Sequence, residues 1–417
     1  MNKQLVVIGG GAAGFFAAIA AAKGNPSLDV SLLEKTGKLL SKVKVSGGGR
    51  CNVTHHCFDI TAMSQRYPRG QHFVRKAFYR FFTKDTIAWF SDRGVELKAE
   101  KDGRMFPVTN SSQTIIDCLL QQARESAVQI NLHAEVHQLQ YSDKRFRLLV
   151  GNTRWIEADF ICIASGGYPK SALFNWIKET GHSIEEPVPS LFTFNLPAHP
   201  LTRLMGVSVD NALVKVSGTK LIEKGPLLIT HWGFSGPAIL RLSAWGAREL
   251  AERNWQFTIS VNWVPEYNEQ TLREHFLQVR REQATQKLES RNPFHLPQRL
   301  WEFLLEDASV DGNGRWSDLP AKDQNRLIGK LCNYECSIKG KTTFKEEFVT
   351  AGGIKLSEVD PHTMMSRKLP GLFFAGEVLD VDGITGGYNF QHAWTSGFIA
   401  GTTIAGQSRD TGSGQGV

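Results

Sequence analysis

Three glycines near the N-terminus have the spacing of a turn that binds the phosphates of a dinucleotide. They are Gly9, Gly11 and Gly14, in the pattern Gly-x-Gly-x-x-Gly. Gly9 permits a tight turn, Gly11 lets the backbone approach a pyrophosphate, and Gly14 lets the following helix pack closely on a strand. That helix is expected to begin at Ala12 and Ala13, where free N–H groups and a partial positive charge would face the phosphates.

An acidic residue follows this turn at the distance expected for a ribose ligand. Glu34 lies twenty residues after Gly14 and ends a predicted strand over 29–33, with Lys35 next to it. Three elements would position the turn and Glu34: a strand over 4–8, a helix over 12–23 and the strand over 29–33. They form a βαβ unit, which implies a parallel sheet. A carboxylate there accepts hydrogen bonds from ribose hydroxyls and repels a 2′-phosphate. The segment therefore predicts FAD or NAD rather than NADP.

A second glycine-rich segment, Ser-Gly-Gly-Gly-Arg-Cys-Asn over 46–52, favours FAD over NAD. Such a segment can follow the pyrophosphate and the edge of the flavin with backbone N–H groups. The predicted cofactor contacts here are Ser46, Gly47, Gly48, Arg50, Cys51 and Asn52. Cys57 follows Cys51 with five residues between them. On a helix that spacing turns the two thiols apart, so a catalytic disulfide is not expected.

The C-terminal part of the chain supplies a further flavin motif. A predicted strand over 372–375 runs into a glycine-rich turn, and a helix begins near Asn389. An acidic side chain of this pattern can bind a ribityl hydroxyl, and the helix start can stabilise an anionic reduced flavin. The predicted contacts are Gly376, Glu377, Asp380, Gly387, Tyr388 and Asn389. Arg50, Tyr388, Asn389 and Gln391 are expected to line the flavin.

Together with segments 103–107, 164–169 and 229–237, these motifs resemble the bacterial HI0933-like flavoprotein family over nearly the whole chain. Ser165 stands where that family usually has threonine. The resemblance implies an α/β fold: a two-piece Rossmann-like FAD-binding domain interrupted by a β-rich domain that carries a helical insertion. It also implies an FAD-dependent oxidoreductase, and its BaiN-like branch reduces carbon–carbon double bonds in bile-acid intermediates. Val136, Ser165 and Gly166 complete the predicted cofactor site.

The expected domain boundaries follow composition. Four prolines, Pro187, Pro189, Pro197 and Pro200, favour an extended linker, so the first part of the FAD-binding domain is placed at 1–190. The β-rich inserted domain follows at 191–265 and its polar helical insertion at 266–335. Residues 336–417 return to the β-rich domain and then complete the FAD-binding domain. Because the inserted region has no dinucleotide fingerprint, we expect it to contribute to substrate binding, with Thr230–Pro237 as a candidate pocket wall.

The composition of the chain limits which binding partners are expected. The chain has 41% hydrophobic and 21% charged residues, a globular balance, and no apolar stretch long enough to span a membrane. Net charge is +7 and the pI about 9.0, but no block of five or six cations occurs, so nucleic acid is not an expected partner. Six sparse cysteines are typical of a reducing compartment, and a cytoplasmic location is expected. Cys332 and Cys336 lack a second pair, so no metal is expected.

The leading interpretation is an FAD-dependent oxidoreductase that acts on a small, unsaturated or otherwise oxidisable molecule. NADH or NADPH is the possible reductant, and it would bind without a second Gly-x-Gly-x-x-Gly unit, because the sequence contains only one in a βαβ context. Two alternatives stay open: a flavoprotein that modifies or binds RNA, and a non-catalytic FAD sensor. The sequence identifies neither a catalytic acid or base nor the oligomeric state.

Overall fold

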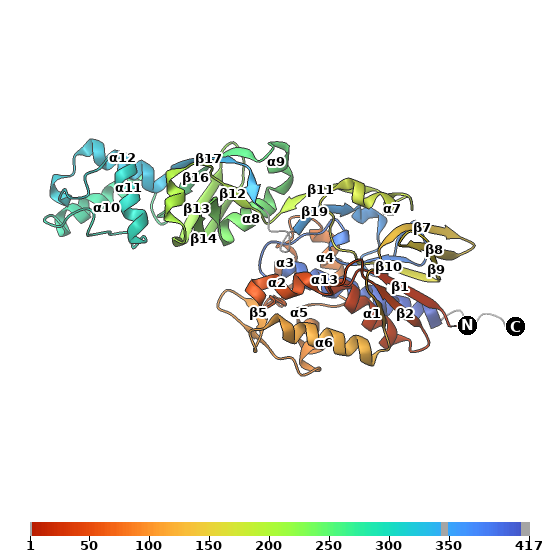
Figure 1. Cartoon of the computed structure of the whole chain (residues 1–417). Coiled ribbons are helices and arrows are strands. Elements are labelled where there is room, and N and C mark those ends of the chain that lie inside the picture. Colours follow the sequence, from red (N-terminus) through yellow and green to blue (C-terminus); the bar gives the residue numbers. More distant parts are fainter. Residues whose placement is uncertain (1, 343–348, 410–417) are drawn as a thin grey trace. The chain divides into compact units, whose positions relative to one another are not determined.

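The computed structural model describes residues 2–342 and 349–409 (Figure 1). The chain divides into two compact units. Unit 1 comprises Met1–Ser190 and Phe344–Val417, and unit 2 comprises Leu191–Thr343. Unit 1 is therefore assembled from two stretches of chain that unit 2 separates in sequence.

A five-stranded parallel sheet forms the centre of unit 1, in the order β20-β10-β1-β2-β6. Its strands are β1 (Gln4–Ile8), β2 (Asp29–Leu33), β6 (Gln129–Asn131), β10 (Phe160–Ile163) and β20 (Leu372–Phe374). The apolar run of β10 is buried throughout, as expected for a strand covered on both faces. Because all strands are parallel, their carboxyl ends share one edge, where β1, β2, β10 and β20 each run into a predicted motif.

Two long helices pack on each other beside this sheet. They are α1 (Ala12–Gly24) and α13 (Tyr388–Arg409), which come from the two ends of the chain. Small residues make the approach possible: a Cβ on Gly397 would lie 2.4 Å from the Ala13 carbonyl oxygen, and one on Gly401 would lie 2.3 Å from that of Ala17. This packing brings the C-terminal flavin motif to the N-terminal turn.

Smaller elements surround this centre. The helices are α2 (Ser41–Gly49), α3 (Ile60–Ser64), α4 (Gln71–Phe78), α5 (Thr83–Ser91), α6 (Ser112–Glu125) and α7 (Asn175–Lys178). One antiparallel sheet holds β3 (Thr54–His55), β5 (Arg104–Pro107) and β4 (Leu97–Ala99), and another holds β7 (Val136–Ser142), β8 (Arg145–Val150) and β9 (Arg154–Ala158). Strands β11 (Ile184–Ser190) and β19 (Val349–Ile354) form an antiparallel pair.

Unit 2 is built on a seven-stranded antiparallel sheet, in the order β17-β16-β13-β14-β15-β12-β18. The strands are β12 (Thr193–Asn195), β13 (Ser208–Val216), β14 (Ile222–Thr230), β15 (Gly233–Ser235), β16 (Gln256–Asn262), β17 (Tyr334–Lys339) and β18 (Lys341–Thr342). Helices α8 (Pro237–Trp245) and α9 (Ala247–Glu252) lie between β15 and β16 in the chain. Helices α10 (Glu269–Glu282), α11 (Gln298–Asp307) and α12 (Ala321–Cys332) lie between β16 and β17, gathered to one side of the sheet (Figure 1).

The predicted fold class is confirmed. A two-piece α/β unit with a parallel sheet is interrupted by a β-rich unit, and that unit carries a helical insertion. One apolar core, which includes the buried Trp263, Trp301 and Trp316, joins the antiparallel sheet of unit 2 to its three inserted helices. The insertion is thus an integral part of unit 2 rather than a loosely attached segment.

Candidate dinucleotide-binding site

The glycines of the first turn differ in what surrounds them. A Cβ on Gly9, whose φ is +117°, would lie 2.3 Å from the Ala164 carbonyl oxygen, and one on Gly14 would lie 1.9 Å from that of Gly9. Gly11 is the N-cap residue of α1, and a Cβ there would meet nothing within 4 Å. No side chain caps the first turn of α1, which includes Ala12. The turn therefore closes tightly on itself and on β10 while it leaves space in front of the helix N-terminus.

The Glu34 carboxylate lies against this turn. Its Oε2 accepts a hydrogen bond from the Gly10 N–H at 2.9 Å, and its Oε1 accepts from the backbone N–H and the hydroxyl of Thr36, each at 2.8 Å. The neighbouring residue Lys35 places its ammonium 5.8 Å from the centre of the Tyr168 ring. Each carboxylate oxygen has two lone pairs, so Glu34 keeps the capacity to accept a further donor.

Val136 lies beyond the ribose acid, at the beginning of β7. It is buried and pairs with Val150 of β8. The Ala134 N–H, two residues earlier, donates to the Glu34 carbonyl oxygen at 2.8 Å. The start of β7 is thus held next to the end of β2, which places Val136 in the neighbourhood of Glu34.

The second glycine segment forms an abrupt left-handed end to α2. Gly47, Gly48 and Gly49 have φ values of +59°, +68° and +82°, and Ser46 is already non-helical. A Cβ on Gly48 or Gly49 would meet nothing within 4 Å. Three left-handed residues in succession are strained for any residue except glycine, which explains the Gly-Gly-Gly run.

The residues after this run are held by the protein itself. The Arg50 guanidinium donates to Glu100 at 2.6 Å and lies 4.0 Å from the centre of the Phe106 ring. Cys51 is fully buried with a φ of +61°, and burial raises the pKa of its thiol to about 12. This thiol is therefore protonated at neutral pH. The Asn52 side-chain amide lies 3.0 Å from the Thr54 carbonyl oxygen and 2.9 Å from the Gly387 nitrogen, and it satisfies both when its nitrogen donates to the first and its oxygen accepts from the second.

That last contact brings the C-terminal motif to the same region. A Cβ on Gly387 would lie 2.5 Å from the Thr54 carbonyl oxygen, and the Tyr388 ring stacks on His55 with centres 4.8 Å apart. At the other end of the motif, a Cβ on Gly376 would lie 2.8 Å from the Cβ of Ala13 in α1. The motif thus extends from the first turn to the segment that follows the second.

Two residues predicted to contact the cofactor have side chains that already form hydrogen bonds within the protein. The Glu377 carboxylate accepts from the Thr350 N–H at 2.8 Å and pairs with Lys42 at 2.6 Å. The Asn389 amide both accepts from the Gly383 N–H at 2.8 Å and donates to the Gly383 carbonyl at 2.9 Å. Asn389 therefore closes the turn before α13, and Glu377 joins α2 and β19 to the turn that follows β20. Asp380 donates its backbone N–H to Ile354 at 3.1 Å, which ties the turn to β19.

Gln391 departs from expectation. Instead of facing an open space, its side chain is fully buried. Its amide oxygen accepts from the Thr54 hydroxyl at 2.6 Å, and its amide nitrogen donates to Thr86 and Thr395 at 2.9 and 3.1 Å. Every polar atom of this amide is satisfied, so Gln391 locks α13 to β3 and α5. Thr54 and Thr86, which sequence reasoning missed, have no motif of their own that would have identified them.

Ser165 and Gly166 follow β10, next to the first turn. A Cβ on Gly9 would lie 2.8 Å from the Ser165 Cα, and Gly166, with a φ of +77°, would have nothing within 4 Å of its Cβ. Gly11, Gly48 and Gly166 thus have open space where a side chain would be, whereas Gly9 and Gly14 face backbone atoms. That contrast fits a cofactor that passes close to the backbone at the first three.

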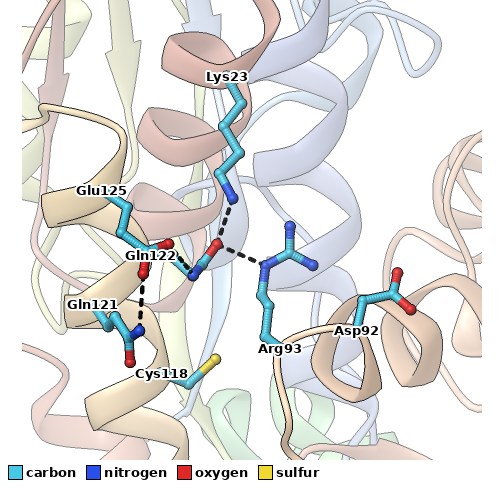
Figure 2. Close-up of a pocket in the computed structure, with 7 residues that line it drawn as sticks. All are labelled: Lys23, Asp92, Arg93, Cys118, Gln121, Gln122 and Glu125. Atoms are coloured by element: carbon cyan, nitrogen blue, oxygen red, sulfur yellow. Dashed lines mark hydrogen bonds between the residues drawn. The ribbon is translucent and has the colours of Figure 1, made fainter.

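A separate cavity of about 360 Å³ contains none of these residues (Figure 2). There Lys23 and Arg93 both donate to the Gln122 amide oxygen, and Gln122 donates to Glu125 at 2.7 Å. Burial, and then the Arg93 charge, lower the pKa of Lys23. The carboxylates of Asp92 and Glu125 balance the charges of the two cations. The residues that line this cavity therefore form a network without net charge, which joins α1, α5 and α6.

The comparisons with known proteins agree with this fold and these motifs. The HI0933-like protein Rossmann domain matches residues 3–403. The chain belongs to the HI0933-like family. This is a family of FAD-dependent oxidoreductases, as the sequence resemblance implied. None of the helices that the structure describes, within 2–342 and 349–409, is long and apolar enough to cross a membrane.

Two curated relatives are similar along nearly their whole length. A 3-dehydro-bile acid delta(4,6)-reductase of Clostridium scindens is 29% identical over 97% of this chain and 99% of its own. A ribosomal RNA dihydrouridine synthase of Escherichia coli is 31% identical over 94% of this chain and 95% of its own. Among solved structures, a 3-ketosteroid delta1-dehydrogenase of Sterolibacterium denitrificans has a TM-score of 0.52 at 13% identity, covering 98% of this chain and 100% of its own. That last likeness shows the fold.

Proposed function

We propose that this chain is a reductase that uses FAD to saturate a carbon–carbon double bond in a ring-bearing substrate, with NADH or NADPH as electron donor. One observation carries the proposal. Within unit 1, Glu34 and Gly376 both lie against the turn at the open N-terminus of α1, although they come from opposite ends of the chain, and the motif that begins at Gly376 continues to the start of α13. A dinucleotide domain that binds only a nicotinamide cofactor has no need of the C-terminal contribution.

The residues present suit FAD, and each has a distinct task in the proposal. The N-terminus of α1 would stabilise the pyrophosphate charge, and Glu34 would accept a ribose hydroxyl. Gly11, Gly48 and Gly166 would let the backbone approach the cofactor, and the start of α13 would place a partial positive charge beside the flavin. When bound, FAD supplies the hydride chemistry that no side chain of this chain provides.

The pair His55 and Tyr388 is the proposed wall on the reactive side. Burial lowers the pKa of His55, so its imidazole is neutral at pH 7. Its Nδ1 lies 3.1 Å from the Gly386 carbonyl oxygen, and a carbonyl only accepts, so the proton resides on Nδ1. A neutral imidazole that is fixed in this way orients the Tyr388 ring and supplies no proton of its own at neutral pH.

The reaction class is proposed from what the two relatives' names share. A delta(4,6)-reductase and a dihydrouridine synthase both add a hydride and a proton across a ring double bond. In the same class of reaction here, NADH or NADPH would lose a hydride and become NAD⁺ or NADP⁺. The substrate C=C would become CH–CH, with the proton taken from an acid or from water.

The substrate is proposed to be a small molecule such as an unsaturated ring ketone, because one relative acts on a bile acid. A base in RNA is the second candidate. It is favoured by the 31% identity to the ribosomal RNA dihydrouridine synthase and by the net charge of +7. Both candidates use the same reductive chemistry, so they differ in what recognises the rest of the substrate.

Anaerobic stopped-flow spectroscopy tests the proposal. The purified protein, loaded with FAD, is mixed with NADH or NADPH, and flavin absorbance is followed. The reduced protein is then mixed with a 3-oxo-4,6-diene steroid or with a uridine-containing RNA. We expect reduction by one nicotinamide and reoxidation by one substrate class. Gly11→Val, which we expect to lose FAD, is the control for signals that do not come from the bound cofactor. A flavin that neither nicotinamide reduces would contradict the donor assignment and favour the sensor alternative.

A further inference from the structure

The solvent side of α4 carries cations and an aromatic ring at helical spacing. His72, Arg75, Lys76, Tyr79 and Arg80 are all exposed, and their spacing of three and four residues places them on one side of the helix and its C-terminal turn. Tyr79 is 68% exposed. The apolar residues of α4 are all buried on the opposite side. The exposed side of α4 is therefore a polar surface and leaves no part of the apolar core uncovered.

No acidic residue occurs between Asp59 and Asp85. The cations in this interval that form no hydrogen bond or ion pair through their side chains within 2–342 and 349–409 are Arg66, Arg75, Lys76, Arg80 and Lys84. The two flanking acids are engaged at helix starts: Asp59 accepts from the Ala62 N–H and Asp85 from the Phe82 N–H, each at 2.7 Å. We name Arg66, Arg75, Lys76, Tyr79, Arg80 and Lys84 the α4 basic face.

Helix stability explains only part of this charge. Arg75 and Lys76 lie in the last turn of α4, where cations interact favourably with the helix dipole. Arg80 lies two residues beyond Phe78, where α4 ends, so the dipole acts on it more weakly. Arg66 and Lys84 lie outside the helix and gain nothing from its dipole. The excess of positive charge thus indicates an anionic partner.

The α4 basic face begins beside the proposed cofactor segment. The Arg66 carbonyl accepts from the Ile384 N–H at 3.0 Å, and the Tyr67 hydroxyl donates to the Tyr388 carbonyl at 2.6 Å. Helix α4 also packs on α13. A polyanion bound along α4 would therefore have one end next to Tyr388.

We infer that the α4 basic face binds a single strand of RNA. Phosphates would contact the cations, while the ring of Tyr79 offers a platform on which a base stacks. An anionic membrane is a poorer fit, because a helix that binds the membrane surface presents apolar side chains to it and those of α4 are buried. The inference rests on the proposed reductase and favours its second candidate substrate, a base carried by RNA, over the small molecule.

The experiment measures RNA binding by the oxidised, FAD-loaded protein without any reductant, so its outcome is independent of the reductase activity. Fluorescence anisotropy with a labelled uridine-rich 20-nucleotide strand gives Kd over a series of KCl concentrations. The double variant Arg75→Ala/Lys76→Ala should weaken binding about tenfold or more and lower the slope of log Kd against log salt by about 1.4, which is about 0.7 for each phosphate contact on a single strand. Tyr79→Ala should weaken binding about tenfold with an unchanged slope, because stacking involves no phosphate.

The matched control is Lys144→Ala/Arg154→Ala, which removes the same charge from two exposed residues of the β7–β9 sheet region. It should bind RNA like the natural chain. Equal losses in both double variants, or RNA binding that does not depend on salt, would overturn the inference. So would binding of phosphatidylglycerol vesicles but not RNA, or an effect that follows a change of oligomeric state in light scattering. If Arg75→Ala/Lys76→Ala does not fold, Arg80→Ala/Lys84→Ala carries the same expectation.

Discussion

In the Gly9–Gly14 turn, two of the glycines are required by the protein itself, because Cβ atoms there would lie 2.3 and 1.9 Å from carbonyl oxygens. In the Gly47–Gly49 turn, the requirement is conformational: all three residues are left-handed, and a Cβ on Gly48 or Gly49 meets nothing within 4 Å. Gly11 belongs to the first turn but resembles the second in having open space. The same residue type thus serves close packing, backbone conformation and proposed ligand approach, and substitutions can separate the three.

The largest expected effect comes from Gly14→Ala. The new Cβ would lie 1.9 Å from the Gly9 carbonyl oxygen, and a backbone atom cannot yield as a flexible side chain does. We expect the free energy of unfolding to fall by at least about 3 kcal/mol, measured by urea denaturation. The control is Gly406→Ala, also inside a helix, where a Cβ meets nothing within 4 Å. It should leave stability unchanged or raise it by up to ~1 kcal/mol, since alanine favours helix. Equal effects would refute the packing role.

Gly11→Val should separate folding from cofactor binding. The position has open space, so we expect unfolding free energy to change by only about 1 kcal/mol, the cost of valine at a helix N-cap. FAD affinity should fall by at least about a hundredfold, because the side chain would occupy the space proposed for the pyrophosphate. Equilibrium dialysis of FAD beside urea denaturation measures both, with Gly11→Ala as a smaller intermediate. A Gly11→Val protein that retains FAD would disprove the assignment of this turn.

The glycine turns also show how much of the site could be predicted from the sequence. The strand–turn–helix unit, the parallel sheet that it implies and the position of Glu34 follow from local patterns, because spacing and burial are properties of short segments. That Gly14 faces a carbonyl and Gly11 faces open space also follows from the general motif. The family resemblance supplied the order of the inserted regions.

The pairings between distant segments could not be predicted. Gln391 has the pattern of a flavin-lining residue, yet its amide is saturated by Thr54, Thr86 and Thr395, which lie hundreds of positions away or on the next helical turn. Contacts of this kind depend on packing, which periodicity within one element does not contain.

Glu34→Ala should have a smaller effect than Gly11→Val. The carboxylate accepts from Gly10 and Thr36, so its loss removes both a proposed ribose ligand and a support of the first turn. We expect FAD binding to weaken by roughly 1–3 kcal/mol, the range for a charged hydrogen-bond partner. Isothermal titration calorimetry on the apoprotein measures it. Glu34→Gln retains acceptor capacity and should lose less, and Thr36→Ala reports the support alone. If Thr36→Ala weakens FAD binding as much as Glu34→Ala, the carboxylate acts only through the turn.

The smallest expected effect tests the second turn. Gly48 has a φ of +68° and no atom within 4 Å of a Cβ, so Gly48→Ala brings conformational strain without a clash. We expect unfolding free energy to fall by about 1 kcal/mol, the cost of one left-handed non-glycine residue. Asparagine tolerates this conformation better, so Gly48→Asn should recover part of that stability.

The same two variants test whether the open space at Gly48 is where the cofactor approaches the backbone. If Gly48 serves conformation alone, FAD affinity should follow stability and be closer to normal in Gly48→Asn. If the backbone there approaches the cofactor, as proposed, asparagine should restore stability while it weakens FAD binding more than alanine does, because its side chain is larger. Urea denaturation of the apoprotein and FAD titration of the same samples decide between these outcomes.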